Sequence, residues 1–208
     1  MKAKIVRFVD VGFHEDFTAY VEFMTNMLDS RDRRSDQGAE VEIVRSRVLG
    51  LIDHALTAKA HVIHLTGHGE ASADDVVLFT DDETTEYSLV EAVGEFQDKS
   101  TPIGAQVILI DACFGASARF QRVLRGCIER ETLLIGSGRS IDWRESTTWA
   151  ATFYSAYLRA KGKGATPIDW AIEAVGRADK AYEILTDRNT PYRSIVLSPN
   201  RAAQNAFG

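Results

Sequence analysis

Short apolar runs alternate with helical patterns along the chain. The apolar runs have the length of strands and are bounded by polar or glycine-containing stretches. They lie at 4–9, 41–44, 61–65, 76–79, 106–110, 132–135 and 194–197. Between them, apolar residues recur at helical spacing, mainly over 17–28, 48–56, 119–128 and 146–158. Strands that alternate with helices predict a mainly parallel sheet with helices on both faces.

Two further helix starts carry capping signals. Ser88 is followed three residues later by Glu91, which is the pattern of a capping box. Thr166 and Pro167 have the residue types of an N-cap and a first helical position, and predict a helix to about residue 185.

The composition is that of an ordinary globular protein with a net charge of -6. Its 208 residues can bury a core without disulfides, and no repeat or linker interrupts the pattern. We therefore expect one domain over residues 1–208. The acidic balance disfavours nucleic acid as a partner. Because the chain has neither a signal-peptide pattern nor an apolar run long enough to span a membrane, we expect a cytoplasmic protein without membrane contact.

Two predicted strand ends carry reactive side chains: His64-Leu-Thr-Gly-His68-Gly69 and Asp111-Ala-Cys113-Phe-Gly. The carboxyl ends of parallel strands meet at one sheet edge, so His68 and Cys113 would meet there if the two strands are neighbours. An imidazole can take the thiol proton and later deliver one to a leaving amine. The backbone amides of Gly69 and Cys113 are candidates for an oxyanion hole.

This pair of motifs resembles the caspase-like cysteine peptidases. A His-Gly followed 45 residues later by Asp-Ala-Cys-Phe-Gly is similar to the caspase signature Gln-Ala-Cys-x-Gly with an upstream His. Asp111 in place of the Gln is similar to metacaspases, paracaspases and some bacterial caspase-like proteins. The stretch 136–154 resembles the bacterial CHAT branch. The resemblance covers about 4–197 and implies a caspase-like three-layer α/β fold, a His68 and Cys113 dyad, and a protein or peptide substrate.

The resemblance also implies a pocket for the substrate side chain before the cut. In the family, the residue two before the nucleophile lines this pocket; here it is Asp111, and a second acid is expected where Asp10 lies. These acids imply cleavage after Arg or Lys, with Arg favoured because a guanidinium can fork onto a carboxylate. Asp142-Trp143-Arg144 resembles the Ser-Trp-Arg of caspases, whose Arg holds a substrate Asp. Asp142 could neutralise Arg144, and Trp143 could form an apolar wall. The alternative role of Asp111 is to cap a loop.

The other histidines have simpler interpretations. His64 lies four residues before His68, so in one continuous strand both would lie on the same face, and His64 would buttress the sheet. His14 and His54 are expected at the surface. His61, His64 and His68 do not follow the spacing of a known zinc site, so we expect no metal and no cofactor.

Cys127 is expected in the core, and the acidic residues 74–75 and 81–83 in solvated loops. The acidic stretch lacks the pattern of a calcium-binding loop.

Three functions remain open at this point. The first is a cysteine endopeptidase, and the second is a catalytically inactive caspase-like scaffold that binds protein partners through the same groove. The third, a nucleotide-binding domain, is disfavoured because no glycine-rich phosphate loop follows any strand. The chain shows no sensor domain, which implies an activating partner or ligand. The resemblance to bacterial caspase-like proteins suggests a regulated effector, as in phage defence.

Overall fold

The computed structural model describes residues 4–11, 15–28, 39–45, 49–72, 75–79, 86–99, 101–160 and 164–200. A central sheet has the strand order β2-β1-β3-β7-β8-β9, in which only β9 is antiparallel to its neighbour. Its strands are β1 (Lys4–Asp10), β2 (Ala39–Arg45), β3 (Val62–Thr66), β7 (Val107–Asp111), β8 (Thr132–Ser137) and β9 (Tyr192–Leu197). The predicted mainly parallel six-stranded sheet is confirmed.

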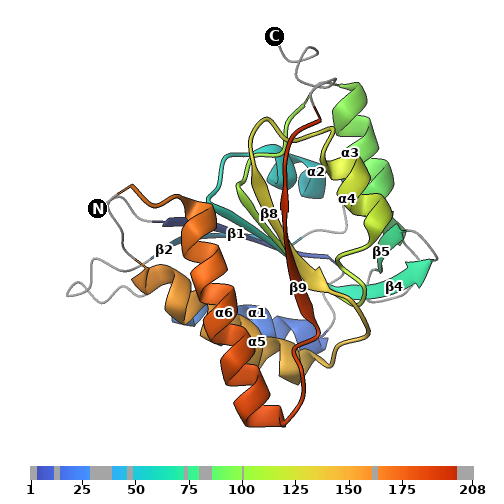
Figure 1. Cartoon of the computed structure of the whole chain (residues 1–208). Coiled ribbons are helices and arrows are strands. Elements are labelled where there is room, and N and C mark those ends of the chain that lie inside the picture. Colours follow the sequence, from blue (N-terminus) through green and yellow to red (C-terminus); the bar gives the residue numbers. More distant parts are fainter. Residues whose placement is uncertain are drawn as a thin grey trace.

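Helices cover both faces of this sheet (Figure 1). One face carries α1 (Glu15–Leu28), α5 (Trp143–Arg159) and α6 (Pro167–Thr186). The other face carries α2 (Leu49–Thr57), α3 (Leu89–Asp98) and α4 (Ala118–Leu124). Because each face is covered, β3 and β7 are buried along their whole length, as their nearly continuous apolar sequences predict. The predicted three-layer α/β arrangement is confirmed.

A second, smaller sheet lies at the edge of the molecule beside α3 and α4 (Figure 1). It is antiparallel and consists of β4 (His68–Ser72), β5 (Asp75–Phe79) and β6 (Glu86–Ser88). Only β5 was expected from the sequence. Gly67 separates β3 from β4, so His68 begins a strand of the second sheet. The expectation that His64 and His68 share one face of one strand is therefore wrong.

Helix ends follow the capping residues. The Ser88 side chain accepts a hydrogen bond from the Glu91 amide at the start of α3, and Thr166 forms a full capping box at the start of α6. Asp142 caps α5, which begins three residues before the predicted position. The helix predicted over 119–128 ends at Leu124.

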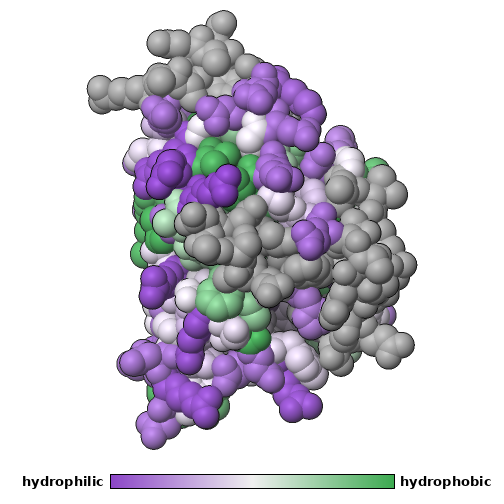
Figure 2. Space-filling model, turned by 90° about the vertical axis from the view of Figure 1, so that its right-hand side faces the viewer, coloured by the Kyte–Doolittle hydropathy of each residue, from purple (hydrophilic) through white to green (hydrophobic). Residues whose placement is uncertain are grey.

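Three predictions fall outside the described residues: the polar loop at 31–38, the surface position of His14 and the loop positions of the acidic residues Asp74 and 81–83. Asp75 was also expected in a loop, but it is the first residue of β5, so that expectation is wrong. Within the described part of the chain, no helix is both long enough and apolar enough to cross a membrane. Hydrophilic side chains predominate among the described residues on the face nearest β4 and β5 (Figure 2).

Candidate active site

The strand register brings the two reactive segments together. β3 and β7 are parallel neighbours, with Thr66 opposite Asp111, so the chain leaves both strands at the same sheet edge. A pocket of about 190 Å³ lies there. It is lined by Gly67, His68, Gly69, Asp111, Ala112, Cys113, Ile141, Asp142, Trp143 and Ser146. All but one of the residues predicted for the site therefore lie around one pocket; the exception is Asp10.

Cys113 lies in a tight turn directly after β7. Phe114 has a left-handed backbone with φ of 60°, which is uncommon for a residue with a side chain. The Phe114 amide donates to the Arg139 carbonyl at 3.3 Å, which ties this turn to the segment after β8. The Cys113 thiol is half-buried, and the Ile141 amide nitrogen lies 3.5 Å from its sulfur and donates to it. The thiol in turn donates to the Ile141 carbonyl at 3.9 Å, so both backbone groups of Ile141 contact the sulfur.

The start of β4 lies against the Cys113 peptide. A Cβ atom at Gly69 would be 2.8 Å from the Cys113 carbonyl oxygen and 3.1 Å from the Cys113 nitrogen. Only glycine allows this approach without displacement of one backbone. Next to it, His68 is exposed and pairs with Phe79 across the second sheet. The small sheet thus places the exposed His68 on the pocket that Cys113 also lines.

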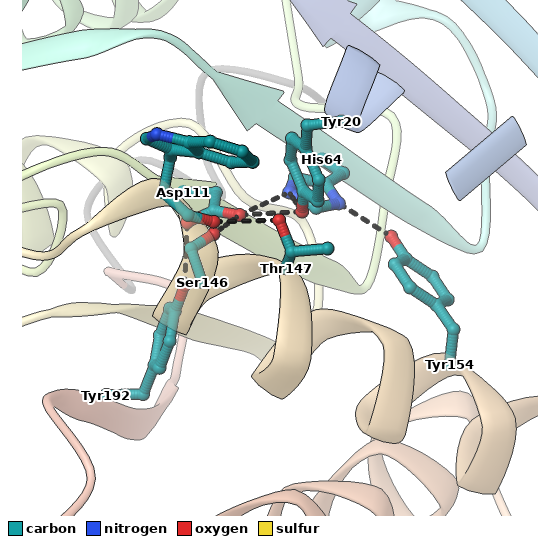
Figure 3. A network of polar contacts seen from close by, with 8 residues as sticks. Tyr20, His64, Asp111, Ser146, Thr147, Tyr154 and Tyr192 are labelled. Carbon is teal, nitrogen blue, oxygen red and sulfur yellow. Dashed lines mark hydrogen bonds and ion pairs between the residues drawn. The ribbon is translucent and has the colours of Figure 1, made fainter. Parts of the chain in front are cut away.

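Asp111 is buried at the base of the pocket and is held from four elements (Figure 3). The Tyr20 hydroxyl on α1 donates to its Oδ2 at 2.7 Å, and the Ser146 hydroxyl on α5 donates to the same oxygen. The Tyr192 hydroxyl on β9 donates to Oδ1 at 2.6 Å. The Nε2 atom of His64 on β3 lies 3.4 Å from Oδ2. These side chains come together only in the folded chain.

The Asp111 carboxyl is ionised in this network. Burial raises its pKa, but hydrogen bonds from His64, Ser146 and Tyr192 outweigh burial, and the pKa lies below its ordinary value. Burial lowers the pKa of His64, so its imidazole is neutral near pH 7. Its Nδ1 lies 3.1 Å from the Tyr154 hydroxyl, which can donate to it and leave Nε2–H to face Asp111. The His64 imidazole and the hydroxyl groups of Ser146 and Tyr192 therefore stabilise the negative charge together.

The residues around the pocket mouth have well-defined contacts. Asp142 is exposed, and its Oδ1 accepts from the Arg144 backbone amide at 2.8 Å as the cap of α5. The Arg144 guanidinium lies over the Trp143 ring, 5.2 Å from the ring centroid, and Arg144 is not among the residues that line the pocket. Asp10 is fully buried at the end of β1 and does not line the pocket. Its predicted part in substrate binding stays a prediction.

The remaining cysteine and two histidines lie elsewhere. Cys127 is buried and its thiol donates to the Val93 carbonyl at 2.8 Å, while burial raises its pKa to about 12. Its predicted core position is confirmed, as is the exposed position of His54. His61 accepts a hydrogen bond from the Ile5 amide through Nδ1. Among the described residues there is no group of three or more side chains that could hold a metal ion.

The sequence interpretation missed the side chains that hold Asp111. The patterns over 17–28 and 146–158 account for Tyr20, Ser146 and Tyr154 as positions of helices and give them no polar partner, and no pattern singles out Tyr192. A buried tyrosine hydroxyl needs a polar partner. Tyrosines at buried positions of the predicted helices therefore indicate that a buried polar group lies nearby.

Comparisons with known proteins agree with this architecture. No protein-family model matches the sequence, and no curated protein matches it. Among solved structures, it is similar to a secreted C11 cysteine protease from Bacteroides thetaiotaomicron in complex with an irreversible peptide inhibitor, at 12% identity and a TM-score of 0.56. That alignment covers 88% of this chain but only 60% of the protease.

A second structure from the same organism, the secreted C11 cysteine protease named iotapain, aligns at 11% identity with a TM-score of 0.47. This alignment covers 82% of this chain and 61% of that one. At identities this low, structural similarity is evidence for a shared fold alone. The fold of this chain is the caspase-like fold of the C11 cysteine proteases.

Proposed function

We propose that this protein is a cysteine endopeptidase in which Cys113 is the nucleophile and His68 the general base. One observation carries the proposal: an exposed imidazole, a half-buried thiol and a buried carboxylate line a single pocket at the ends of two adjacent parallel strands. The peptide-inhibited protease with the same fold supports a peptide substrate.

The residues of the pocket offer the groups that acyl transfer needs. His68 takes the Cys113 proton, and the thiolate attacks the scissile carbonyl carbon. The amides of Gly69 and Cys113 donate to the oxyanion that forms, and the close contact between these two segments supports this pairing. His68 then protonates the leaving amine, which leaves a thioester on Cys113. A water molecule, deprotonated by His68, hydrolyses the thioester and restores the thiol.

The charges in the pocket support cleavage after a basic residue. Asp111 is ionised at its base, and Asp142 lies at its mouth. A substrate Asp or Glu would meet two like charges, which disfavours its binding by several kcal/mol when the contact is desolvated. Arg144, the residue that could hold an acidic side chain, is directed at the Trp143 ring.

A covalent probe tests the proposal. A peptidyl acyloxymethyl ketone with Arg before the warhead should label wild type at Cys113, as read by mass spectrometry of the digested protein. The same peptide with Asp in place of Arg should label far more slowly. His68→Ala should slow labelling and peptide cleavage by roughly 10²–10⁴-fold, whereas His54→Ala, at an exposed position, should leave both rates unchanged.

The alternative function, an inactive caspase-like scaffold, predicts a different result. If the protein is a scaffold, wild type and His68→Ala should show the same labelling of Cys113. Addition of a peptide should not change this result. Labelling at Cys127 instead of Cys113 would contradict the assignment of Cys113 as the nucleophile.

The biological setting of the proposed peptidase rests on the sequence resemblance to the CHAT branch and to bacterial caspase-like proteins. We propose a cytoplasmic effector that an activating partner or ligand switches on, as in phage defence. Peptide cleavage that rises when products of neighbouring genes are added to the purified protein would support this setting. Full activity of the protein alone would count against an activator.

A further inference from the structure

The three hydroxyl groups around Asp111 limit how a substrate side chain can bind its carboxylate. This limit adds to the proposed function a statement about which basic side chain the pocket accepts. A carboxylate offers about four acceptor positions, two on each oxygen. On Oδ2, the Tyr20 and Ser146 hydroxyls occupy both, with the His64 Nε2 nearby at 3.4 Å. On Oδ1, the Tyr192 hydroxyl is the single donor among the described residues. Within this described part of the chain, one acceptor position of Asp111 therefore remains, and it is on Oδ1.

This geometry bears on the choice between Arg and Lys. A guanidinium gains over an ammonium at a carboxylate because it can donate to both oxygens at once. That fork needs one acceptor position on each oxygen, and Oδ2 has both of its positions occupied. The expectation that Arg is preferred over Lys rests on the fork, which this network does not allow.

We infer that the pocket binds a basic side chain through a single contact with Oδ1 of Asp111, and so accepts Lys as readily as Arg. Ser146 is the positioning residue that sets this breadth. It lines the pocket, and its hydroxyl covers the acceptor position on Oδ2 that a guanidinium could otherwise reach. Tyr20 covers the other position but does not line the pocket. The inference rests on the proposed function for its substrate class, but binding alone can test it.

The test uses the Cys113→Ala protein, which binds without cutting. Two peptides that differ only in Arg or Lys before the scissile bond are titrated by calorimetry, with an Ala peptide as reference. We expect the two dissociation constants to agree within about threefold, and both basic peptides to bind more tightly than the Ala peptide. The further substitution Ser146→Ala should free one acceptor position on Oδ2 of Asp111. The Arg peptide should then bind about tenfold or more tightly than the Lys peptide, because it gains one charge-assisted hydrogen bond.

Two further variants separate this role from a loss of packing. Ser155→Ala removes a hydroxyl from an exposed position of the same helix and should leave the Arg-to-Lys ratio unchanged. Tyr192→Phe frees a position on Oδ1 but none on Oδ2, so it should not create an Arg preference.

Three results would overturn the inference: a strong Arg preference in the parent protein, an equal shift in the Ser146 and Tyr192 variants, or basic peptides that bind no better than the Ala peptide. Failure of the proposed function is a separate result, namely wild type that neither takes up the Arg probe at Cys113 nor cleaves any peptide.

Discussion

At the scale of single residues, the two cysteines show how environment decides reactivity. Both are free thiols that donate to a backbone carbonyl, but Cys113 is half-buried and also accepts from the Ile141 amide, whereas Cys127 is buried. Only a thiolate reacts readily, and the pKa of Cys127 is raised to about 12. The difference arises from the polarity and access of the two sites.

We therefore expect iodoacetamide to modify native wild type at Cys113 alone, near neutral pH. Peptide mapping by mass spectrometry measures the extent at each cysteine. Cys113→Ala should take up almost no label until the protein is unfolded in urea, and it should have lost peptidase activity. Cys127→Ala should keep both the label and most of the activity; its inactivity would point to the wrong nucleophile.

His64 gives the fold a dependence on pH. Its pKa is lowered by burial, so between the folded pKa and about 6.5 the unfolded chain binds a proton that the folded protein does not. The free energy of unfolding should thus be constant above about pH 6.5 and fall below it, by up to about 1.4 kcal/mol per pH unit for this one proton.

Urea unfolding at about pH 7.5 and about pH 5.5 measures this slope. His64→Gln should be less stable at the higher pH but should lose less stability on acidification than wild type. His54→Gln is the control, because His54 is exposed, and it should keep the wild-type slope. Some slope should remain in both variants, since the pKa of His61 is also lowered by burial. An equal slope in His64→Gln and wild type would contradict the assignment.

At the scale of elements, the position of β4 depends on Gly69. Gly69→Ala would place a methyl group 2.9 Å from the Ala112 side chain and still closer to the Cys113 carbonyl oxygen. We expect a loss of about 1–3 kcal/mol in stability, because the backbone must shift, and a marked loss of peptide cleavage.

Gly94→Ala is the matched control, since nothing lies within 4 Å of its added Cβ. Gly94 lies inside α3, where replacement by Ala should raise the free energy of unfolding by at most about 1 kcal/mol. Thermal unfolding and a peptide assay on both variants check the pair. Normal activity in Gly69→Ala would argue against the close approach of β4 to Cys113.

The elements that the sequence predicted are those with strong local signals. The apolar runs of β1, β3, β7 and β8, and the caps at Ser88 and Thr166, appear where they were expected. β4 was missed because His68-Gly-Glu-Ala-Ser72 contains no Val, Ile, Thr, Phe, Tyr or Trp; its strand form comes from pairing with β5.

For the site, the sequence predicted the residues that flank glycines at strand ends, and they do line one pocket. It did not predict the Asp111 network, because Tyr20, His64, Ser146 and Tyr192 are far apart in the chain. Periodicity assigns such residues to a buried face but does not say which hydroxyl meets which carboxylate. That information comes only from the register of the sheet and the packing of the helices.

At the scale of the whole molecule, the Asp111 network joins α1, β3, α5 and β9 to β7. Tyr20, Tyr154 and Tyr192 belong to the hydrophobic core between the sheet and α1, α5 and α6. Cys127 belongs to the core on the opposite face. If the two cores unfold as one cooperative unit, damage to the network must expose a thiol on the other side of the sheet.

We expect Asp111→Asn to lower stability by about 2 kcal/mol and so to speed the alkylation of Cys127 by about 30-fold in native buffer. The rate is measured by mass spectrometry in a Cys113→Ala background, which leaves one reactive thiol. Asp142→Asn, at an exposed helix cap, should change this rate much less. A destabilised Asp111→Asn protein with an unchanged Cys127 rate would show that the two cores open independently.

The position of Tyr192 has a consequence for the order of synthesis. β9 is the last described strand to leave the ribosome, yet among the described residues its Tyr192 hydroxyl is the single donor to Oδ1 of Asp111. Until β9 is added next to β8, that oxygen has no protein donor among the described contacts, and the edge of β8 is uncovered. A growing chain thus carries the thiol and the imidazole long before its pocket is finished.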